Sequence, residues 1–96
     1  MEKTKSYVGL FIITPEKQDV IDEVKSKITT SITENSGSIV EENMIGKRDL
    51  AYPIKKKEEG VYLELTFSAE PASIAKIKRQ CEINTDILRT LIDRNE

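Results

Sequence analysis

The sequence predicts one α+β domain, spanning residues 1–96, with four strands and two helices in the order βαββαβ. Residues 60–68 alternate strictly between apolar and polar side chains, which is typical of a strand with one buried face. Two other segments open at a proline and then repeat apolar residues at spacings of three and four, as amphipathic helices do. A chain of 96 residues is long enough for one hydrophobic core.

The first strand and helix are predicted from residues 7–37. Residues 7–13, YVGLFII, are apolar and β-prone, and they are too few for a helix. Thr14 can cap a helix that has Pro15 at its first position. The apolar stripe of this helix comprises Ile21, Val24, Ile28 and Ile32, with Val20 widening it. Gly37 is expected to supply the left-handed residue that ends the helix.

The second half of the chain provides the remaining elements. Residues 38–54 show mixed alternation broken at Gly46, so they predict a long edge strand that bends at this glycine. The alternating strand 60–68 follows, and then a helix that Pro71 opens. The apolar positions of the second helix are Ile74, Ile77 and Cys81. Residues 87–93 can close a ferredoxin-like fold, a four-stranded antiparallel sheet with both helices on one face.

One face of this sheet is predicted to lack a helical cover. The first strand is central in this topology, and we expect its alternate residues Val8, Leu10 and Ile12 to pack under the helices. The open face would then carry Tyr7, Phe11, Ile13 and Tyr62. An uncovered apolar face of this size indicates a partner. We therefore take these residues, with Tyr52, as candidates for partner binding.

Positive charge is concentrated in residues 46–57, GKRDLAYPIKKK. This segment carries a net charge of +4, whereas the rest of the chain sums to −6. A local cluster of this kind can neutralise phosphates although the whole chain is acidic. The candidate RNA contacts are Lys47, Arg48, Lys55, Lys56 and Lys57, extended by Lys3, Lys5 and Arg89. The alternative is that residues 55–57 form only a solvated turn.

Catalytic and metal chemistry find little support. The chain has no histidine, and its single cysteine, Cys81, belongs to the apolar side of a helix. Glu41 and Glu42 are adjacent in a predicted strand, so their side chains point to opposite faces. We expect no enzymatic activity, cofactor, metal or small-molecule substrate. No apolar run is long enough to span a membrane, and the lone cysteine favours a reducing, cytoplasmic setting.

Two alternatives share this predicted fold. Single-stranded RNA-binding modules stack bases on aromatic residues of the two central strands. Phe11 fits the first of their motifs, but Val61 and Leu63 stand where the second requires aromatic side chains. The other alternative is a module that binds a ligand or a protein and no RNA, because one fold hosts unrelated functions.

An ordered set of motifs resembles one known family. The basic segment carries Gly46-x-Arg48-x-Leu50-Ala51-Tyr52-Pro53-Ile54, followed by lysines, a short charged turn and Gly60-x-Tyr62. The surrounding frame carries Tyr7-x-x-x-Phe11-Ile12-Ile13-x-Pro15, Gly37, Pro71-x-x-Ile74 and Asn84-x-x-Ile87-Leu88-Arg89. Over nearly its whole length, the chain is similar to the bacterial small-subunit ribosomal protein six family.

The resemblance implies a structural ribosomal protein without catalytic activity, located in cytoplasmic ribosomes. Members of that family bind the central domain of small-subunit ribosomal RNA as a heterodimer with ribosomal protein eighteen. Carried over by position, Lys47, Arg48 and Lys55 are the expected phosphate contacts, with Arg48 first because a guanidinium can contact phosphate in a bidentate manner. Asp49 departs from the family pattern and interrupts the basic strip. The partner is expected on the open face or along the edge strand 38–54.

Overall fold

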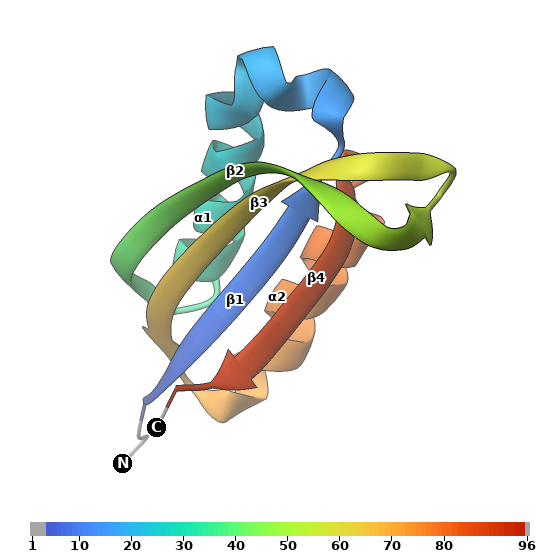
Figure 1. Ribbon diagram of the computed structural model, residues 1–96. Coiled ribbons are helices and arrows are strands. Elements are labelled where there is room, and N and C mark those ends of the chain that lie inside the picture. Colours follow the sequence, from blue (N-terminus) through green and yellow to red (C-terminus); the bar gives the residue numbers. More distant parts are fainter. Residues whose placement is uncertain (1–3, 96) are drawn as a thin grey trace.

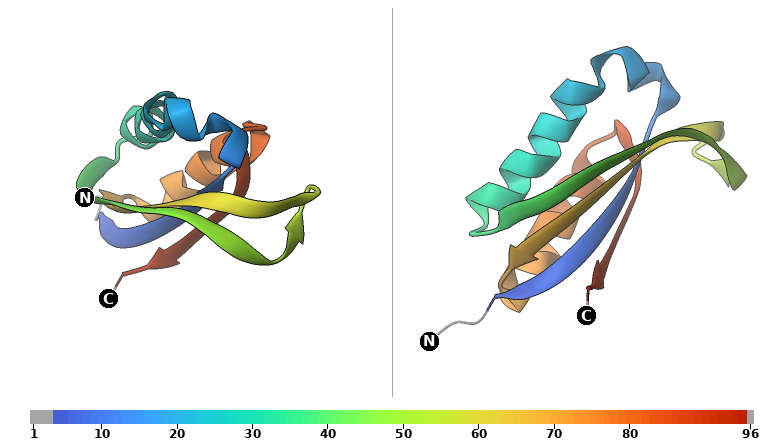
Figure 2. Two further views of the ribbon diagram at one scale, coloured as in Figure 1. Left: turned by 45° about the horizontal axis from the view of Figure 1, so that its top comes forward. Right: turned by 60° about the vertical axis from the view of Figure 1, so that its left-hand side comes forward.

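The computed structural model describes residues 4–95 and contains a four-stranded antiparallel sheet in the order β2-β3-β1-β4. Its elements are β1 (Lys5–Ile13), η1 (Pro15–Val20), α1 (Ile21–Glu34), β2 (Ser38–Ile54), β3 (Lys57–Ala69), α2 (Pro71–Ile83) and β4 (Ile87–Arg94). Both α-helices lie on the same face of the sheet (Figures 1 and 2). The predicted ferredoxin-like βαββαβ fold is confirmed.

The start of the first helix differs from the prediction. Residues 15–20 form the 3₁₀ helix η1, and α1 begins only at Ile21. A 3₁₀ helix has three residues per turn, so its side chains do not continue the stripe of the α-helix that follows. Val20 is accordingly 39% exposed and does not widen the apolar stripe as predicted. Val24, Ile28 and Ile32 are buried, as expected for the stripe itself.

The left-handed residue that follows α1 is Ser36, and the prediction of Gly37 for this position is wrong. Ser36, with φ 67°, adopts the left-handed conformation that was expected of Gly37. Gly37 is needed for a different reason, because a Cβ atom there would lie 2.6 Å from Ile32 Cγ2. Its backbone N–H donates to the Ile32 carbonyl at 2.9 Å. A side chain at this position would therefore push the chain away from the end of the helix.

The first strand presents the opposite face to the one predicted. Tyr7, Phe11 and Ile13 are buried in the core beneath the helices, with at most 6% of their surface exposed. Their cross-strand neighbours in β3 are Phe67, Leu63 and Val61, which form the buried side of that strand. A shift of one residue turns every side chain of a strand to the other face. Val8, Leu10 and Ile12 therefore belong to the open face, and the predicted placement of Tyr7, Phe11 and Ile13 there is wrong.

The aromatic side chains of β1 and β3 explain why Tyr7, Phe11 and Ile13 face the helices. Phe11 and Phe67 are fully buried, and the Tyr7 ring stacks on Phe67 with 5.9 Å between centroids. Gly9 makes room for the Phe11 ring, since a Cβ atom there would lie 2.8 Å from Phe11 Cε2. The core under the helices needs these large rings, whereas the branched aliphatic residues of β1 suffice for the open face.

Strand β2 lies at the edge of the sheet and bends at Gly46, as predicted. Gly46 has φ 103°, a conformation that L side chains rarely adopt, and the pairing with β3 shifts register between Met44 and Gly46. Beyond the bend, β2 and β3 continue as a hairpin that projects from the body of the sheet (Figures 1 and 2). The projection contributes to the elongated shape, which measures 44 × 24 × 21 Å.

Candidate functional site: a basic hairpin and an open sheet face

The tip of the β2–β3 hairpin consists of two lysines in an unusual backbone conformation. Ile54 pairs with Lys57, so Lys55 and Lys56 are the two central residues of the turn. Their φ angles are 50° and 68°, and two successive positive values are the mark of a type I′ turn. Asn-Gly is the favoured sequence there, and positive φ costs an ordinary residue about 1–2 kcal/mol. The turn geometry therefore does not explain two lysines.

The other predicted cations of the hairpin have partners within the described chain. Lys47 Nζ lies 3.9 Å from Glu59 Oε2, and Lys57 forms an ion pair with Glu16. The hydrogen bond from Lys57 is the largest cause that lowers the pKa of Glu16, ahead of the Thr14 hydroxyl. Arg48 is exposed, and its Nη1 donates to the carbonyl of Lys47 at 3.0 Å. Within residues 4–95, Lys55 and Lys56 make no ion pair.

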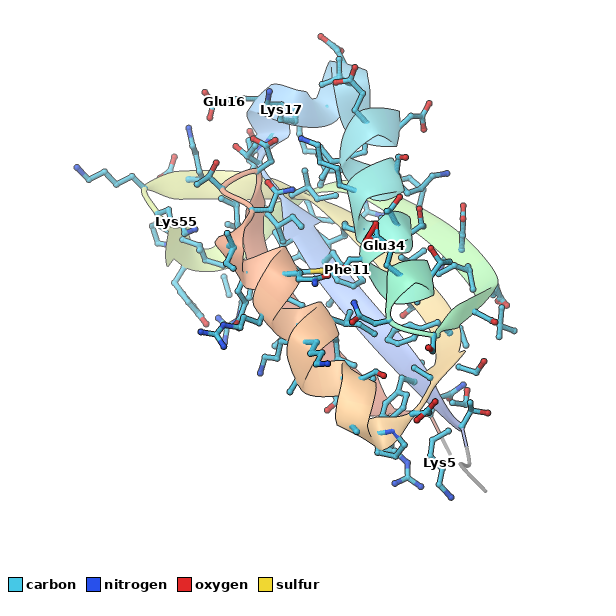
Figure 3. The ribbon with its side chains drawn as sticks, turned by 180° about the vertical axis from the view of Figure 1, so that it is seen from behind. Lys5, Phe11, Glu16, Lys17, Glu34 and Lys55 are labelled. Atoms are coloured by element: carbon cyan, nitrogen blue, oxygen red, sulfur yellow. The ribbon has the colours of Figure 1, made fainter. Side chains whose placement is uncertain are left out.

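Of the remaining predicted RNA-binding residues, Arg89 lies beside the hairpin and Lys5 lies far from it. Arg89 of β4 belongs with the hairpin, because its Nη1 donates to the Tyr52 hydroxyl at 2.6 Å. Lys5 stands at the far end of β1, roughly 27 Å along the strand from Ile13 at about 3.4 Å per residue. Figure 3 shows Lys5 and Lys55 at opposite ends of the molecule. Lys3 lies outside the described residues.

Residues 50–53 leave the ladder between β2 and β3, and we call them the 50–53 excursion. Asp49 pairs with Glu59 and Ile54 with Lys57, so four residues of β2 face only Glu58 of β3. The hydrogen bond to Arg89 ties Tyr52, which is 58% exposed, to the other edge of the sheet. The excursion therefore reaches over the open face toward β4.

The excursion and the sheet together enclose a groove of about 280 Å³ on the open face. Its lining residues are Leu10, Ile12, Leu50, Ala51, Tyr52, Ile54, Tyr62, Arg89 and Leu91. Gly60 leaves room for Ile12 beneath the groove, since a Cβ atom there would lie 2.4 Å from Ile12 Cγ2, whereas Leu50 Cδ2 of the excursion would be at an ordinary contact distance of 3.5 Å. Tyr52 and Tyr62 were predicted for this surface, whereas Leu10, Leu50 and Leu91 were not. Two signals in the sequence could have indicated these leucines. Leu10 and Leu91 alternate with core residues of their strands, and Leu50 belongs to the motif that contains Tyr52.

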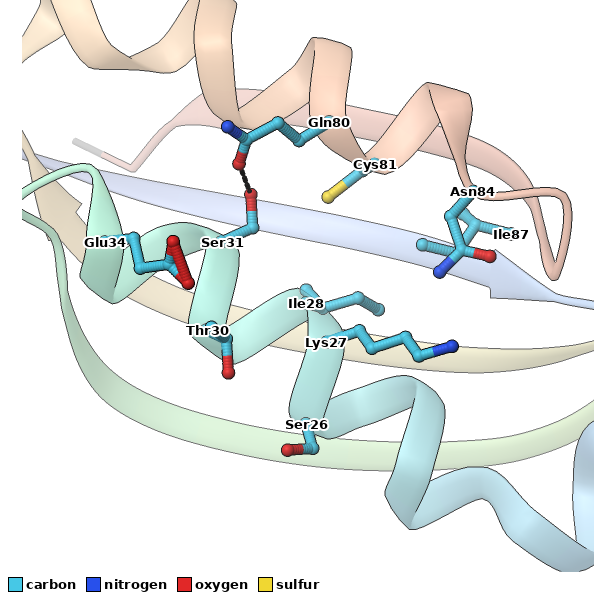
Figure 4. A pocket seen from close by; sticks show the side chains of 10 residues that line it. All are labelled: Ser26, Lys27, Ile28, Thr30, Ser31, Glu34, Gln80, Cys81, Asn84 and Ile87. Carbon is cyan, nitrogen blue, oxygen red and sulfur yellow. Dashed lines mark hydrogen bonds between the residues drawn. The ribbon is translucent and has the colours of Figure 1, made fainter.

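A second cleft, of about 290 Å³, lies between α1 and α2 on the opposite side of the sheet (Figure 4). It is lined by Ser26, Lys27, Ile28, Thr30, Ser31, Glu34, Gln80, Cys81, Asn84 and Ile87. Ser31 donates to Gln80 Oε1 at 2.5 Å across it. Cys81 is 2% exposed, and burial raises the pKa of its thiol to about 11. A covered and protonated thiol is a poor nucleophile at neutral pH.

Metal ligands and membrane spans bear on the class of protein. Among residues 4–95, no three His, Cys, Asp or Glu side chains are grouped so that they could hold a metal ion. No helix in this part of the chain is long and apolar enough to cross a membrane. The features that remain are an exposed cationic hairpin and a partly covered apolar face. They are typical of a small α+β binding domain.

Comparisons with known proteins specify the family. The model of the family "Ribosomal protein S6" matches residues 6–94. A "Small ribosomal subunit protein bS6" from Paenarthrobacter aurescens (strain TC1) is 38% identical over 96% of this chain and 92% of its own length. The crystal structure of 30S ribosomal protein S6 from Thermotoga maritima superposes with a TM-score of 0.89 at 25% identity, covering 97% of this chain and 89% of that one. The chain belongs to the ribosomal protein S6 family, and the predicted resemblance is confirmed.

Similarity of fold alone would not have been enough to assign the chain to this family. The C-terminal domain of MgtC from Mycobacterium tuberculosis superposes with a TM-score of 0.68 at 12% identity, covering 100% of this chain and 93% of that one. At this identity the likeness concerns the fold only. The match of residues 6–94 to the family, which includes the hairpin and the excursion, carries the assignment.

Proposed function

We propose that this chain is a structural protein of the small ribosomal subunit in the cytoplasm, binding the central domain of the subunit's rRNA together with ribosomal protein eighteen. It catalyses no reaction in this account. The observation that carries the proposal is the hairpin tip, where Lys55 and Lys56 occupy positive-φ positions and make no ion pair within residues 4–95. Strain of this kind is found where function requires it. A pair of free ammonium groups at an exposed tip suits a phosphate backbone.

The RNA contacts are those of the hairpin and its neighbour Arg89. Arg48 can present two parallel N–H donors to one phosphate, which a lysine cannot do. Lys55 and Lys56 act as mobile point charges, and Lys47 can exchange its 3.9 Å contact with Glu59 for a phosphate oxygen. Such contacts position the protein without reading bases, so preference among RNAs depends on their shape.

Base stacking on Phe11 has no place in this account. The Phe11 side chain is fully buried beneath the helices, so a nucleobase cannot reach its ring in the folded protein. This finding removes the residue on which the single-stranded RNA-binding alternative depended. Of the aromatic residues among the predicted site residues, Tyr52 and Tyr62 are the two that reach the open face.

The protein partner is assigned to the open face rather than to the edge of β2. The face carries the groove between Tyr52, Tyr62 and Leu91. The β2 edge is interrupted by register shifts between Ile39 and Glu41 and between Met44 and Gly46. Such bulges hinder the addition of another strand. Tyr7, Phe11 and Ile13 support the face from the core side and do not contact the partner.

The double variant Lys55→Gln/Lys56→Gln tests the RNA half of the proposal. It removes both charges and keeps similar side-chain lengths, so the affinity for a central-domain rRNA fragment should fall. The slope of log K against log salt should decrease by about 1–2, as expected for the loss of two phosphate contacts. The matched control is Lys76→Gln/Lys78→Gln, which removes two exposed lysines from α2. Equal slopes for the two double variants would refute the assigned RNA surface.

A further inference from the structure

The projecting part of the β2–β3 hairpin receives little support from the rest of the sheet. Strand β1 ends at Ile13, which pairs with Val61, so residues 57–60 of β3 extend beyond the end of β1. On the other side of these residues the 50–53 excursion interrupts the ladder with β2. A two-stranded hairpin on its own is marginally stable in water. The direction of the tip therefore depends on contacts outside the ladder.

Glu16 of η1 makes one such contact. Its carboxylate forms an ion pair with Lys57, the residue that follows the two lysines of the tip. The same carboxylate accepts a hydrogen bond from the Thr14 hydroxyl at 3.2 Å. Thr14 is 6% exposed, and its backbone N–H donates to the Asp86 carbonyl at 2.8 Å. Glu16 is thereby attached to the body of the protein, and Figure 3 shows it at the same end of the molecule as Lys55.

The contact between Arg89 and the Tyr52 hydroxyl holds the other strand of the hairpin. The two contacts start from different elements, η1 and β4, and reach different strands, β3 and β2. Lys57 and Tyr52 both lie within three residues of the tip lysines. A hairpin held at one point can swing about that point, whereas contacts on both strands fix its direction.

A carboxylate is unexpected beside a surface that binds phosphates. Glu16 repels a phosphate backbone, and it also occupies Lys57, one of the predicted RNA contacts. Charge alone would therefore make Glu16 unfavourable for RNA binding. Glu58 offers a comparison, because it is an exposed acid of the same hairpin and forms no ion pair within residues 4–95. The two acids differ in their attachment, since Glu16 connects the hairpin to η1.

We propose that Glu16 is a positioning residue for RNA binding, which acts through Lys57 to hold the cationic hairpin in the direction in which Lys55 and Lys56 meet the phosphate backbone. A hairpin that is already fixed loses less conformational freedom when it binds, and this preorganisation raises affinity. The acid therefore favours the binding of an anion, because its orienting effect exceeds its repulsion. The role of Glu16 rests on the proposed function, since RNA binding at the hairpin is proposed there.

The test compares Glu16→Gln with Glu58→Gln, which removes the same charge from an unpaired acid. Binding to a central-domain rRNA fragment is measured in the presence of ribosomal protein eighteen. Charge alone predicts tighter binding by both variants, and Glu16→Gln also frees Lys57 for a phosphate. We expect Glu16→Gln instead to bind about two- to fivefold more weakly, as fits the loss of one exposed ion pair. Glu58→Gln should bind at least as tightly as the parent protein.

An exchange of charges provides a rescue. Glu16→Lys adds positive charge but places two lysines opposite each other, so we expect weaker binding than that of the parent protein. Glu16→Lys/Lys57→Glu restores an ion pair with its signs exchanged, and it should recover most of the lost affinity. This double variant is less positive than Glu16→Lys by two units of charge. Recovery of affinity for an anion after such a loss reports the pair and not the charge.

The order of the hairpin is a second readout, and it does not depend on RNA. The heteronuclear NOE of the Lys55 and Lys56 amides reports motion on the ps–ns timescale, and it should fall in Glu16→Gln but not in Glu58→Gln. A lower NOE together with weaker RNA binding supports the positioning role. An unchanged NOE, or RNA binding by Glu16→Gln at least as tight as that of the parent, would overturn this role and leave the proposed function intact. Failure of the parent protein to bind the rRNA fragment would instead overturn the proposed function, and the positioning role with it.

Discussion

At the scale of single residues, Gly60 is where the packing between β3 and β1 depends on the absence of a side chain. A Cβ atom at this position would lie 2.4 Å from Ile12 Cγ2, so Ile12 or the strand must move. We expect Gly60→Ala to lower the free energy of unfolding by about 1–3 kcal/mol, as overpacking does. Urea denaturation measures it, with the exposed Glu58→Ala as a control that should stay within about 0.5 kcal/mol. An unfolding free energy equal to that of the parent would show that Ile12 makes room for the added methyl group without cost.

Cys81 predicts a particular dependence of stability on pH. Burial raises the pKa of its thiol in the folded protein from 9.0 to about 11. The unfolded chain therefore loses this proton first, and the stabilising contribution present below pH 9 is lost as the pH rises toward 11. We expect a loss of up to about 2 kcal/mol across this range.

The control for this prediction is Cys81→Ala, which has no thiol to titrate. Lysines and tyrosines also titrate near this pH, so only the difference between the two proteins is informative. The parent should lose more of its unfolding free energy than Cys81→Ala between pH 9 and 11. Parallel curves would contradict the burial of the thiol.

At the scale of secondary-structure elements, the hairpin predicts a conflict between stability and binding. Lys55→Asn/Lys56→Gly places the favoured type I′ residues at φ 50° and 68°. This variant should gain about 1–2 kcal/mol in unfolding free energy because the strain of two positive φ angles is relieved. It should also bind rRNA more weakly, because two cations are lost.

The matched comparison is Lys55→Gln/Lys56→Gln, which removes the same charges and keeps the strain. It should lose rRNA affinity to a similar extent without gaining stability. Thermal unfolding and filter binding measure the two quantities on the same preparations. A gain in stability with full rRNA affinity would show that the lysines at the tip are not used for binding.

The elements also show which parts of the fold can be predicted from the sequence. The alternation in β3 and the 3–4 spacing of α1 and α2 are local patterns, and the structure confirms these elements. The orientation of β1 could not be predicted in this way, because its residues are apolar on both faces. Packing of Phe11 and Tyr7 against the helices decides it, and this packing is a tertiary effect.

The excursion is a further feature that local patterns do not predict. Residues 50–53 lie within what the sequence indicates as one strand, and the structure includes them in β2. Only the cross-strand pairing shows that they leave the ladder, and only the contact between Tyr52 and Arg89 shows where they go. The basic hairpin could be predicted because it is a local cluster, whereas Lys5 was included although it lies at the other end of β1.

At the scale of the whole molecule, the net charge is small, but the charged residues are distributed unevenly. The chain sums to −2, yet five of its fifteen basic residues are gathered in one hairpin. Net charge alone would suggest a poor RNA binder. The arrangement of charge instead suggests a local surface for phosphates at the hairpin.

The central claim is that RNA affinity is shared between this chain and ribosomal protein eighteen. Its most direct test is binding of the parent protein to a central-domain fragment of small-subunit rRNA, over a salt series, with and without that partner. The account predicts weak binding alone and strong, salt-sensitive binding with the partner present. Tight binding by the isolated chain would contradict shared affinity, and no binding in either condition would show that the hairpin is only a solvated turn.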